Sequence, residues 1–403
     1  MRAALLAACL ALAPMPALAQ AELITTKRTF ALPSYTTRAG ATIKWVKVGW
    51  ESYGTLNADR SNATLVTHFF SGTSHAAGRY AASDRAPGYW DAIIGPGKAI
   101  DTDKYFVLSS DTLVNLSPKD PTVVTTGPAT VDPDTGQPYG PNFPVVSMRD
   151  FVEVQRALVE SLGIAKLKAV VGASMGALQA YEWAGAHPDM VERIVPVIGA
   201  AGGDAFLTAW LDVWGQPIRL DPKWRGGAYD PADPPKDGLA AALKVVSLHA
   251  NGAEWAAKTF GTAPADPAKD PAGALANRYK IEAALDAGGA ARANVADANH
   301  LLYLARANQL TAVDPATIKV PALLVSTPTD LVFRQEWVER TAAAIRANGT
   351  PVETMTVEGP NGHLNGVLHI APAGPRIAAF LAQAFPAQAL PTQALPTQAL
   401  PTK

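Results

Sequence analysis

A serine flanked by glycines, between a short apolar run and a helical pattern, constrains this chain more than any other feature. The serine is Ser174, within Gly-Ala-Ser-Met-Gly at residues 172–176. Residues 167–171 predict a strand that leads into it, and residues 177–185 predict a helix that leaves it. A serine at so sharp a turn has a strained backbone, so the positions two before and two after it must be small. The pattern predicts a nucleophile, although a serine that only caps a helix would show the same five residues.

A serine hydroxyl is a poor nucleophile until a histidine takes its proton, and a carboxylate must hold that histidine in one tautomer. Residues 320–326 predict a buried strand, and Asp330 lies in the loop that follows it. Residues 352–357 predict the next strand, and His363 lies in the loop after that one. The order serine, aspartate, histidine, each after a predicted strand, is far more specific than the serine motif alone. We therefore expect Ser174, Asp330 and His363 to form a catalytic triad.

Other residues of the same types leave alternatives open. Asp204 or Glu358 could supply the acid. His369, which the pattern places at the start of the last helix, could supply the base. Three further histidines lie in or at the end of helical segments and are expected to be surface or packing residues: His187, His249 and His300.

An acyl-transferring serine also needs backbone N–H groups that hold the developing oxyanion. Residues 63–67 predict an early strand that runs into the loop 68–75. We expect one donor from this loop, at Phe70, and one from the residue after the nucleophile, Met175. Ser71 would then border the substrate pocket, although a plain glycine- and serine-containing loop would look the same.

Four stretches of the chain resemble homoserine O-acetyltransferases: residues 68–78, 89–107, 136–144 and 174–183. The resemblance extends over residues 32–385. It implies an α/β-hydrolase fold, with a mostly parallel central sheet and a helical cap, and it supports the same triad. It does not by itself decide the substrate, because one fold hosts many reactions.

Two departures from that family concern the substrate. Where family members carry an arginine for the homoserine carboxylate, this chain has Gly215, and Leu364 replaces the aspartate that follows the catalytic histidine. Hydrogen bonds to charged groups contribute about 1.5–3 kcal/mol each, so their loss disfavours a zwitterion. Trp214 and Leu364 predict a pocket for a less polar ester. Arg219 and Arg225 lie nearby, and either could reach a carboxylate if the alignment slips.

The N-terminus predicts export. Residues 1–19 combine a short positive start, an apolar stretch and a small-residue cleavage site, which is typical of a signal peptide cut after Ala19. The mature protein would then be periplasmic or secreted, away from cytosolic acetyl-CoA. Cys9, the one cysteine, leaves with this segment, so a disulfide is not expected.

Composition excludes several other classes. A net charge of −1 and a charged fraction of 17% give no basic surface for nucleic acid. His68 and His75 lack cysteines or clustered carboxylates that would complete a zinc site, so we expect no metal and no cofactor. The expected partner is a small-molecule ester, without nucleic acid or a membrane span after signal cleavage, and a homodimer is left open.

Strands and helices alternate, which predicts an α/β chain in four parts after the signal peptide. The core covers residues 20–203 and 315–387, and a helical cap covers residues 204–314. Residues 388–403 repeat Gln-Ala-Leu-Pro-Thr three times and predict a disordered tail, because proline every fifth residue prevents a helix.

These features together predict a serine esterase that hydrolyses small acyl esters through an acyl-enzyme. The alternative is an O-acyltransferase of the homoserine O-acetyltransferase type that uses the same triad. A non-catalytic binding protein on the same fold is the third reading.

Overall fold

The computed structural model describes residues 23–385. The predicted signal peptide and the predicted tail from residue 388 lie outside this range. Within it, no helix is long and apolar enough to cross a lipid bilayer.

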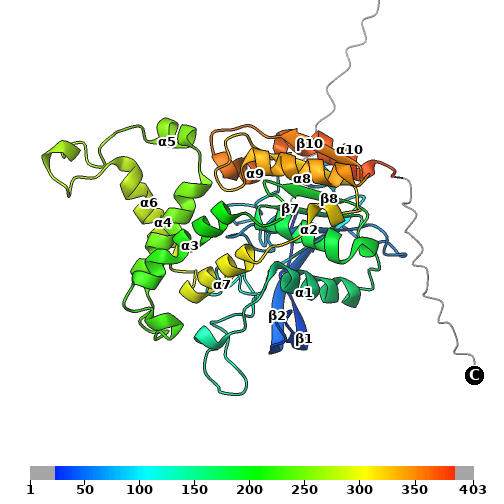
Figure 1. Ribbon diagram of the computed structural model, residues 1–403, viewed down its shortest axis with the longest axis horizontal. Helices are drawn as coiled ribbons and strands as arrows, with labels where there is room; N and C mark the ends of the chain where they lie inside the picture. Colours follow the sequence, from blue (N-terminus) through cyan, green and yellow to red (C-terminus); the bar gives the residue numbers. More distant parts are fainter. Residues whose placement is uncertain (1–22, 386–403) are drawn as a thin grey trace, which may run out of the picture.

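An eight-stranded sheet forms the centre of the molecule, in the order β1-β2-β6-β3-β7-β8-β9-β10 (Figure 1). The first three strands in this order pair antiparallel and the others pair parallel. A small parallel pair, β4 (Ile94–Gly95) and β5 (Ile100–Asp101), lies apart from it. The strands of the large sheet are β1 (Arg28–Thr36), β2 (Thr42–Tyr53), β3 (Ala63–Thr67), β6 (Phe106–Ser110), β7 (Ala169–Ala173), β8 (Ile194–Val197), β9 (Ala322–Ser326) and β10 (Val352–Thr356).

Both faces of the sheet are buried, because neighbouring residues of its central strands enter two different cores. Leu65 belongs to one hydrophobic cluster and Val66 to the other. The first cluster packs under α1 (Met148–Ser161), α2 (Met175–Ala186) and α8 (Gln335–Ala347). The second packs under α10 (Gly374–Ala382). Parallel strands covered on both faces explain why the sequence shows continuous apolar runs there.

Five helices lie between β8 and β9 in the chain, within the predicted cap. Figure 1 shows α3 to α6 gathered beside the sheet, with α7 between them and the core. Their bounds are α3 (Ala205–Leu220), α4 (Lys236–Ala250), α5 (Ala253–Thr259), α6 (Lys280–Arg292) and α7 (Ala298–Gln309). The domain boundaries inferred from the sequence stay predictions.

The predicted fold class is confirmed, and the elements around the site lie within two residues of their expected bounds. The helix predicted after Ser147 begins at Met148, and the Ser147 N–H donates to Asp150 Oδ2 at 2.7 Å, as a capping box requires. One prediction is wrong: His369 does not begin the last helix but ends the one-turn helix α9 (Asn365–Leu368). Pro372 lies in a short 3-10 turn, Ala371–Ala373, and Pro375 lies in the first turn of α10, where proline is tolerated because the first N–H groups of a helix have no partner within it.

Candidate active site

The turn from β7 to α2 holds Ser174 in the conformation that its flanking glycines predict. Ser174 has φ 55° and ψ −117°, a backbone region that residues with side chains rarely adopt. A Cβ on Gly172 would lie 2.1 Å from Thr67 Oγ1, and a Cβ on Gly176 would lie 2.1 Å from the Thr67 carbonyl oxygen. The glycines therefore let the turn press against the end of β3, and this packing maintains the strain at Ser174.

The structure brings the three predicted triad residues together. His363 Nε2 lies 2.7 Å from Ser174 Oγ, and His363 Nδ1 lies 2.7 Å from Asp330 Oδ2. All three side chains are buried, with 5–7% of each residue exposed. A serine–histidine–carboxylate relay with both hydrogen bonds short and buried is the arrangement needed to activate a hydroxyl nucleophile.

The loop after β9 also fixes the acid itself. Asp330 Oδ1 accepts hydrogen bonds from the backbone N–H groups of Val332 and Phe333, at 2.7 and 2.9 Å, so that Oδ2 is left for the histidine. The two alternative acids have other places in the fold. Asp204 caps α3 through the N–H groups of its first turn, and Glu358 is exposed.

The rival base is also placed elsewhere. His369 Nε2 lies 3.0 Å from Asn361 Oδ1 and so bonds within its own loop. His300 is fully buried between α7 and the loop after β6, where Nδ1–H donates to the Asn115 carbonyl at 2.7 Å. His187 ends α2 and bonds to Glu153. Of the histidines predicted to be packing residues, only His249 lies against the site.

The predicted oxyanion donors lie at two turns beside the nucleophile. Phe70 belongs to the tight turn in which the Gly72 N–H donates to the Phe69 carbonyl, and Met175 is the first residue of α2. The first N–H groups of a helix have no partner within that helix. No described residue accepts a hydrogen bond from the Phe70 amide. Their role as oxyanion donors stays a prediction.

Sequence reasoning did not identify a buried carboxylate that anchors the loop after β3. Glu51 on β2 is 0% exposed and accepts hydrogen bonds from the Tyr53 hydroxyl at 3.0 Å and the Tyr80 hydroxyl at 2.8 Å. Lys27 Nζ lies 3.0 Å from Oε1, and His75 Nδ1 lies 3.0 Å from Oε2.

Electrostatics keep this carboxylate charged. Burial alone would raise the pKa of Glu51, but the hydrogen bond from His75, the charge of Lys27 and the hydrogen bond from Tyr80 lower it to about 2. Because the Tyr53 hydroxyl also accepts the N–H groups of Ala76 and Ala77, the same cluster fixes the chain just after the oxyanion turn.

The predicted pocket residues differ in what they contact. Trp214 on α3 is buried, and its ring meets the Phe70 ring edge to face, with centroids 5.3 Å apart. Ser71 lies half-buried in the oxyanion turn, and Leu364 lies half-buried directly after His363. Their roles in binding substrate stay predictions.

Gly215, where the sequence argument expected a substrate-binding arginine to be missing, is buried on α3. A Cβ there would lie 2.5 Å from Leu302 Cδ2 on α7, so the residue marks a close contact between two cap helices. The loss of a carboxylate-binding arginine at this position stays a prediction. Arg219, one turn further, pairs with Asp212 at 2.8 Å.

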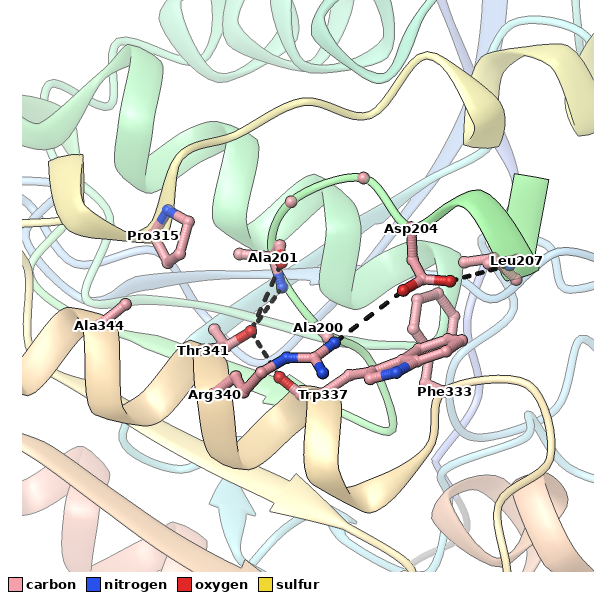
Figure 2. A pocket seen from close by; sticks show the side chains of 12 residues that line it. Ala200, Ala201, Asp204, Leu207, Pro315, Phe333, Trp337, Arg340, Thr341 and Ala344 are labelled. Carbon is pink, nitrogen blue, oxygen red and sulfur yellow. Dashed lines mark hydrogen bonds and ion pairs between the residues drawn. The ribbon is translucent and has the colours of Figure 1, made fainter.

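At least two cavities border the acid loop in the described part of the chain. The first, of about 270 Å³, lies where the connection from β8 to α3 passes α8 (Figure 2). Phe333 and Trp337 both line it. The Phe333 ring also lies near the His363 ring, with centroids 5.9 Å apart. The second, of about 350 Å³, is lined by Asp330 and His249 among others. Residues 23–385 contain no cluster of three or more histidine, cysteine, aspartate or glutamate side chains that could hold a metal ion.

Comparison with known proteins defines the class first. Residues 115–369 match the family described as alpha/beta hydrolase fold. With the sheet order and the triad geometry, this match makes the chain an enzyme of the α/β hydrolase superfamily. Within that superfamily the chain belongs to the homoserine O-acetyltransferase family, as the following relatives show.

The homoserine O-acetyltransferase of Symbiobacterium thermophilum is 36% identical over 81% of this chain and 86% of that protein. The homoserine O-acetyltransferase of Methanococcoides burtonii is 44% identical over 52% of this chain, a match that spans 42% of that longer protein.

Solved structures agree on the fold and carry two kinds of name. Homoserine O-acetyltransferase from Bacillus anthracis is 34% identical, with a TM-score of 0.84, over 89% of this chain and 98% of that one. Esterase E22 is 46% identical, with a TM-score of 0.85, over 89% of this chain and 100% of that one.

The comparisons contradict the esterase prediction and favour its alternative. Curated relatives that share most of their length with this chain are named homoserine O-acetyltransferases. The prediction depended on Gly215 and Leu364 and on an export signal that lies outside the described residues. Substrates of this family are small molecules, as expected.

Proposed function

We propose that this protein is an O-acyltransferase of the homoserine O-acetyltransferase type, which moves an acetyl group from acetyl-CoA to the hydroxyl of homoserine. The observation that carries the chemistry is the buried relay from Asp330 through His363 to Ser174, with both hydrogen bonds at 2.7 Å. The names of the full-length relatives support the acceptor.

The first half-reaction acylates the serine. His363 Nε2 takes the hydroxyl proton as Ser174 Oγ attacks the thioester carbonyl, and the backbone N–H groups of Phe70 and Met175 hold the oxyanion. When the carbon–sulfur bond breaks, His363 returns the proton to the leaving thiol. Asp330 Oδ2 accepts the Nδ1–H, which fixes the tautomer and stabilises the imidazolium.

The second half-reaction transfers the acyl group. His363 takes the proton of the acceptor hydroxyl, whose oxygen attacks the acyl carbonyl, and Ser174 leaves with the proton that His363 then returns. Water competes for the same acyl-enzyme, so the acceptor must be held in position and water kept out. The low exposure of the triad residues is consistent with this requirement.

Release of CoA thiol should depend on the acceptor hydroxyl. With acetyl-CoA in excess, we expect L-homoserine to accelerate steady-state thiol release, and L-2-aminobutyrate, which has the same carbon chain without the hydroxyl, to leave it unchanged. Thiol release can be followed with a chromogenic disulfide. Equal rates with both compounds would contradict acceptor-dependent turnover.

We also propose that residues 1–19 direct export to the periplasm or beyond, with cleavage after Ala19. Expression of the whole chain in a bacterial host should give a periplasmic or secreted protein whose N-terminal sequence begins at Gln20. A cytosolic product that keeps residues 1–19 would contradict export. Export would separate the enzyme from cytosolic acetyl-CoA, so an exported enzyme would need another acyl donor in the cell, and the assay with acetyl-CoA tests the transfer chemistry independently of location.

A further inference from the structure

His249, in the last turn of α4, joins the cap to the loop that carries Asp330. Its Nδ1 accepts the indole N–H of Trp214 at 3.1 Å, and its Nε2–H donates to the Leu331 carbonyl at 3.0 Å. Only the neutral tautomer with the proton on Nε2 satisfies both bonds. Because Leu331 directly follows Asp330, the cap is bonded to the backbone of the acid loop.

Aromatic contacts fix the imidazole ring between two cap tryptophans. Trp210 stacks on His249 with centroids 4.2 Å apart, and Trp214 meets the same ring at 5.7 Å and nearly at right angles. Trp214 in turn contacts Phe70 in the oxyanion turn. An unbroken set of contacts therefore runs from the oxyanion turn, through the cap, to the acid loop.

The turn after α4 is also attached to the loop of the catalytic histidine. The backbone N–H of Trp255 donates to the Pro360 carbonyl at 3.0 Å, and the Asn361 side-chain amide donates to Asn251 Oδ1 at 3.2 Å. Gly252 and Gly362 pack so closely that a Cβ on Gly362 would lie 2.8 Å from the Gly252 nitrogen. One cap segment, residues 249–255, thus touches both loops that hold triad residues.

The charge state of His249 suits this role. Burial lowers its pKa, and the charge of His363 lowers it further, while the Leu331 carbonyl and Asp330 oppose the shift. The other charged groups lining the adjoining cavity, Arg334 and Glu336, pair with each other at 2.6 Å. At neutral pH the ring is therefore uncharged and keeps its single tautomer.

We propose that His249 is a positioning residue for acyl transfer, which holds the Asp330 loop in register through its bond to the Leu331 carbonyl. This inference depends on the triad chemistry of the proposed function but not on the identity of the acceptor. A positioning role predicts a loss in the rate of serine acylation, with little change in binding. A role confined to stability predicts a lower melting temperature and an unchanged rate.

The test separates the two hydrogen bonds of His249. Glutamine places an amide donor near the position of Nε2, whereas asparagine is shorter and can replace only the acceptor near Nδ1. With p-nitrophenyl acetate as the acyl donor, we expect His249→Leu and His249→Asn to lower kcat by roughly 10- to 100-fold, the loss expected when a catalytic group shifts by up to an ångström. KM should stay close to the wild-type value, and His249→Gln should recover most of kcat.

The matched control is His187→Gln, since His187 also packs against a tryptophan, Trp183, but at the end of α2 opposite Ser174, where it bonds to Glu153. It should leave kcat unchanged, whatever its effect on the melting temperature. Wild-type kcat in folded His249→Leu, or full activity in His249→Asn with none in His249→Gln, would overturn the inference. Turnover that survives Ser174→Ala would instead contradict the proposed function itself.

Discussion

Replacing Ser174 with alanine should abolish acyl transfer, with kcat reduced on the order of 10⁶-fold, as for other triad nucleophiles. The loss is large because no other group can form the acyl-enzyme once Oγ is gone, even with His363 and Asp330 in place. Thiol release from acetyl-CoA in the presence of homoserine measures it. Removing one buried hydroxyl should leave the melting temperature close to that of the wild type.

Ser326→Ala is the matched control for this prediction. Ser326 is a buried serine at the carboxyl end of β9, and its hydroxyl makes only a long contact, of 3.5 Å, with the Met355 carbonyl. It should retain activity near the wild-type level. Substantial turnover in Ser174→Ala would exclude the acyl-enzyme mechanism.

Replacing Glu51 with glutamine should lower the free energy of unfolding by about 3–5 kcal/mol, the cost of removing one partner from a buried ion pair. Glu51 is 0% exposed and accepts hydrogen bonds from the Tyr53 and Tyr80 hydroxyls. His75 Nδ1 and Lys27 Nζ each lie 3.0 Å from its carboxylate. Chemical denaturation gives the free energy. Glu160→Gln, which breaks an exposed pair with Arg156, should cost less than about 1 kcal/mol.

The same carboxylate makes stability depend on pH. Its pKa is about 2 in the folded protein against 4.5 for an ordinary glutamate, so its contribution is complete above pH 4.5 and is lost as pH falls toward 2. At 1.36 kcal/mol per pKa unit, that contribution is on the order of 3 kcal/mol. The wild type should lose this much more stability than Glu51→Gln across that pH range. Parallel curves for the two proteins would contradict the account.

Local sequence patterns were sufficient to predict the triad. Each of Ser174, Asp330 and His363 follows a strand, and the carboxyl ends of parallel strands meet at one edge of a sheet. Chain order and strand periodicity therefore brought together residues that are separated by up to 189 positions. The need for glycine at 172 and 176 was also predictable from the sharp turn at the serine, and in the structure both glycines pack against Thr67.

Contacts between distant segments were not readable in the same way. His249 lies in an ordinary helical pattern, and its bond to the Leu331 carbonyl depends on how the cap docks, which no local pattern records. One feature of the sequence could have indicated the buried role of Glu51. It is a charged residue near the end of an alternating strand, at a position that the structure buries. Apart from Tyr53 on the same strand, its partners come from the loop after β3 and from Lys27, so their convergence could not be inferred from spacing.

The functional prediction was wrong because it took two missing charges as decisive for the reaction. The residue types at two positions do not establish the reaction, since one fold hosts many reactions. Gly215 lies close to Leu302 on α7, and its effect on substrate binding stays a prediction. Leu364 directly follows the catalytic histidine and is half-buried. Identification of the reaction product, and not the residue type, tests whether Leu364 favours a less polar substrate.

The most direct measurement of the central claim is the fate of the acetyl group. The purified protein is incubated with acetyl-CoA and millimolar L-homoserine, and O-acetylhomoserine and free acetate are quantified by mass spectrometry. Ser174→Ala serves as the blank. We expect O-acetylhomoserine to be the main product and to disappear with the variant. Acetate as the main product, with O-acetylhomoserine no higher than in the blank, would contradict the assignment as a homoserine-type O-acyltransferase.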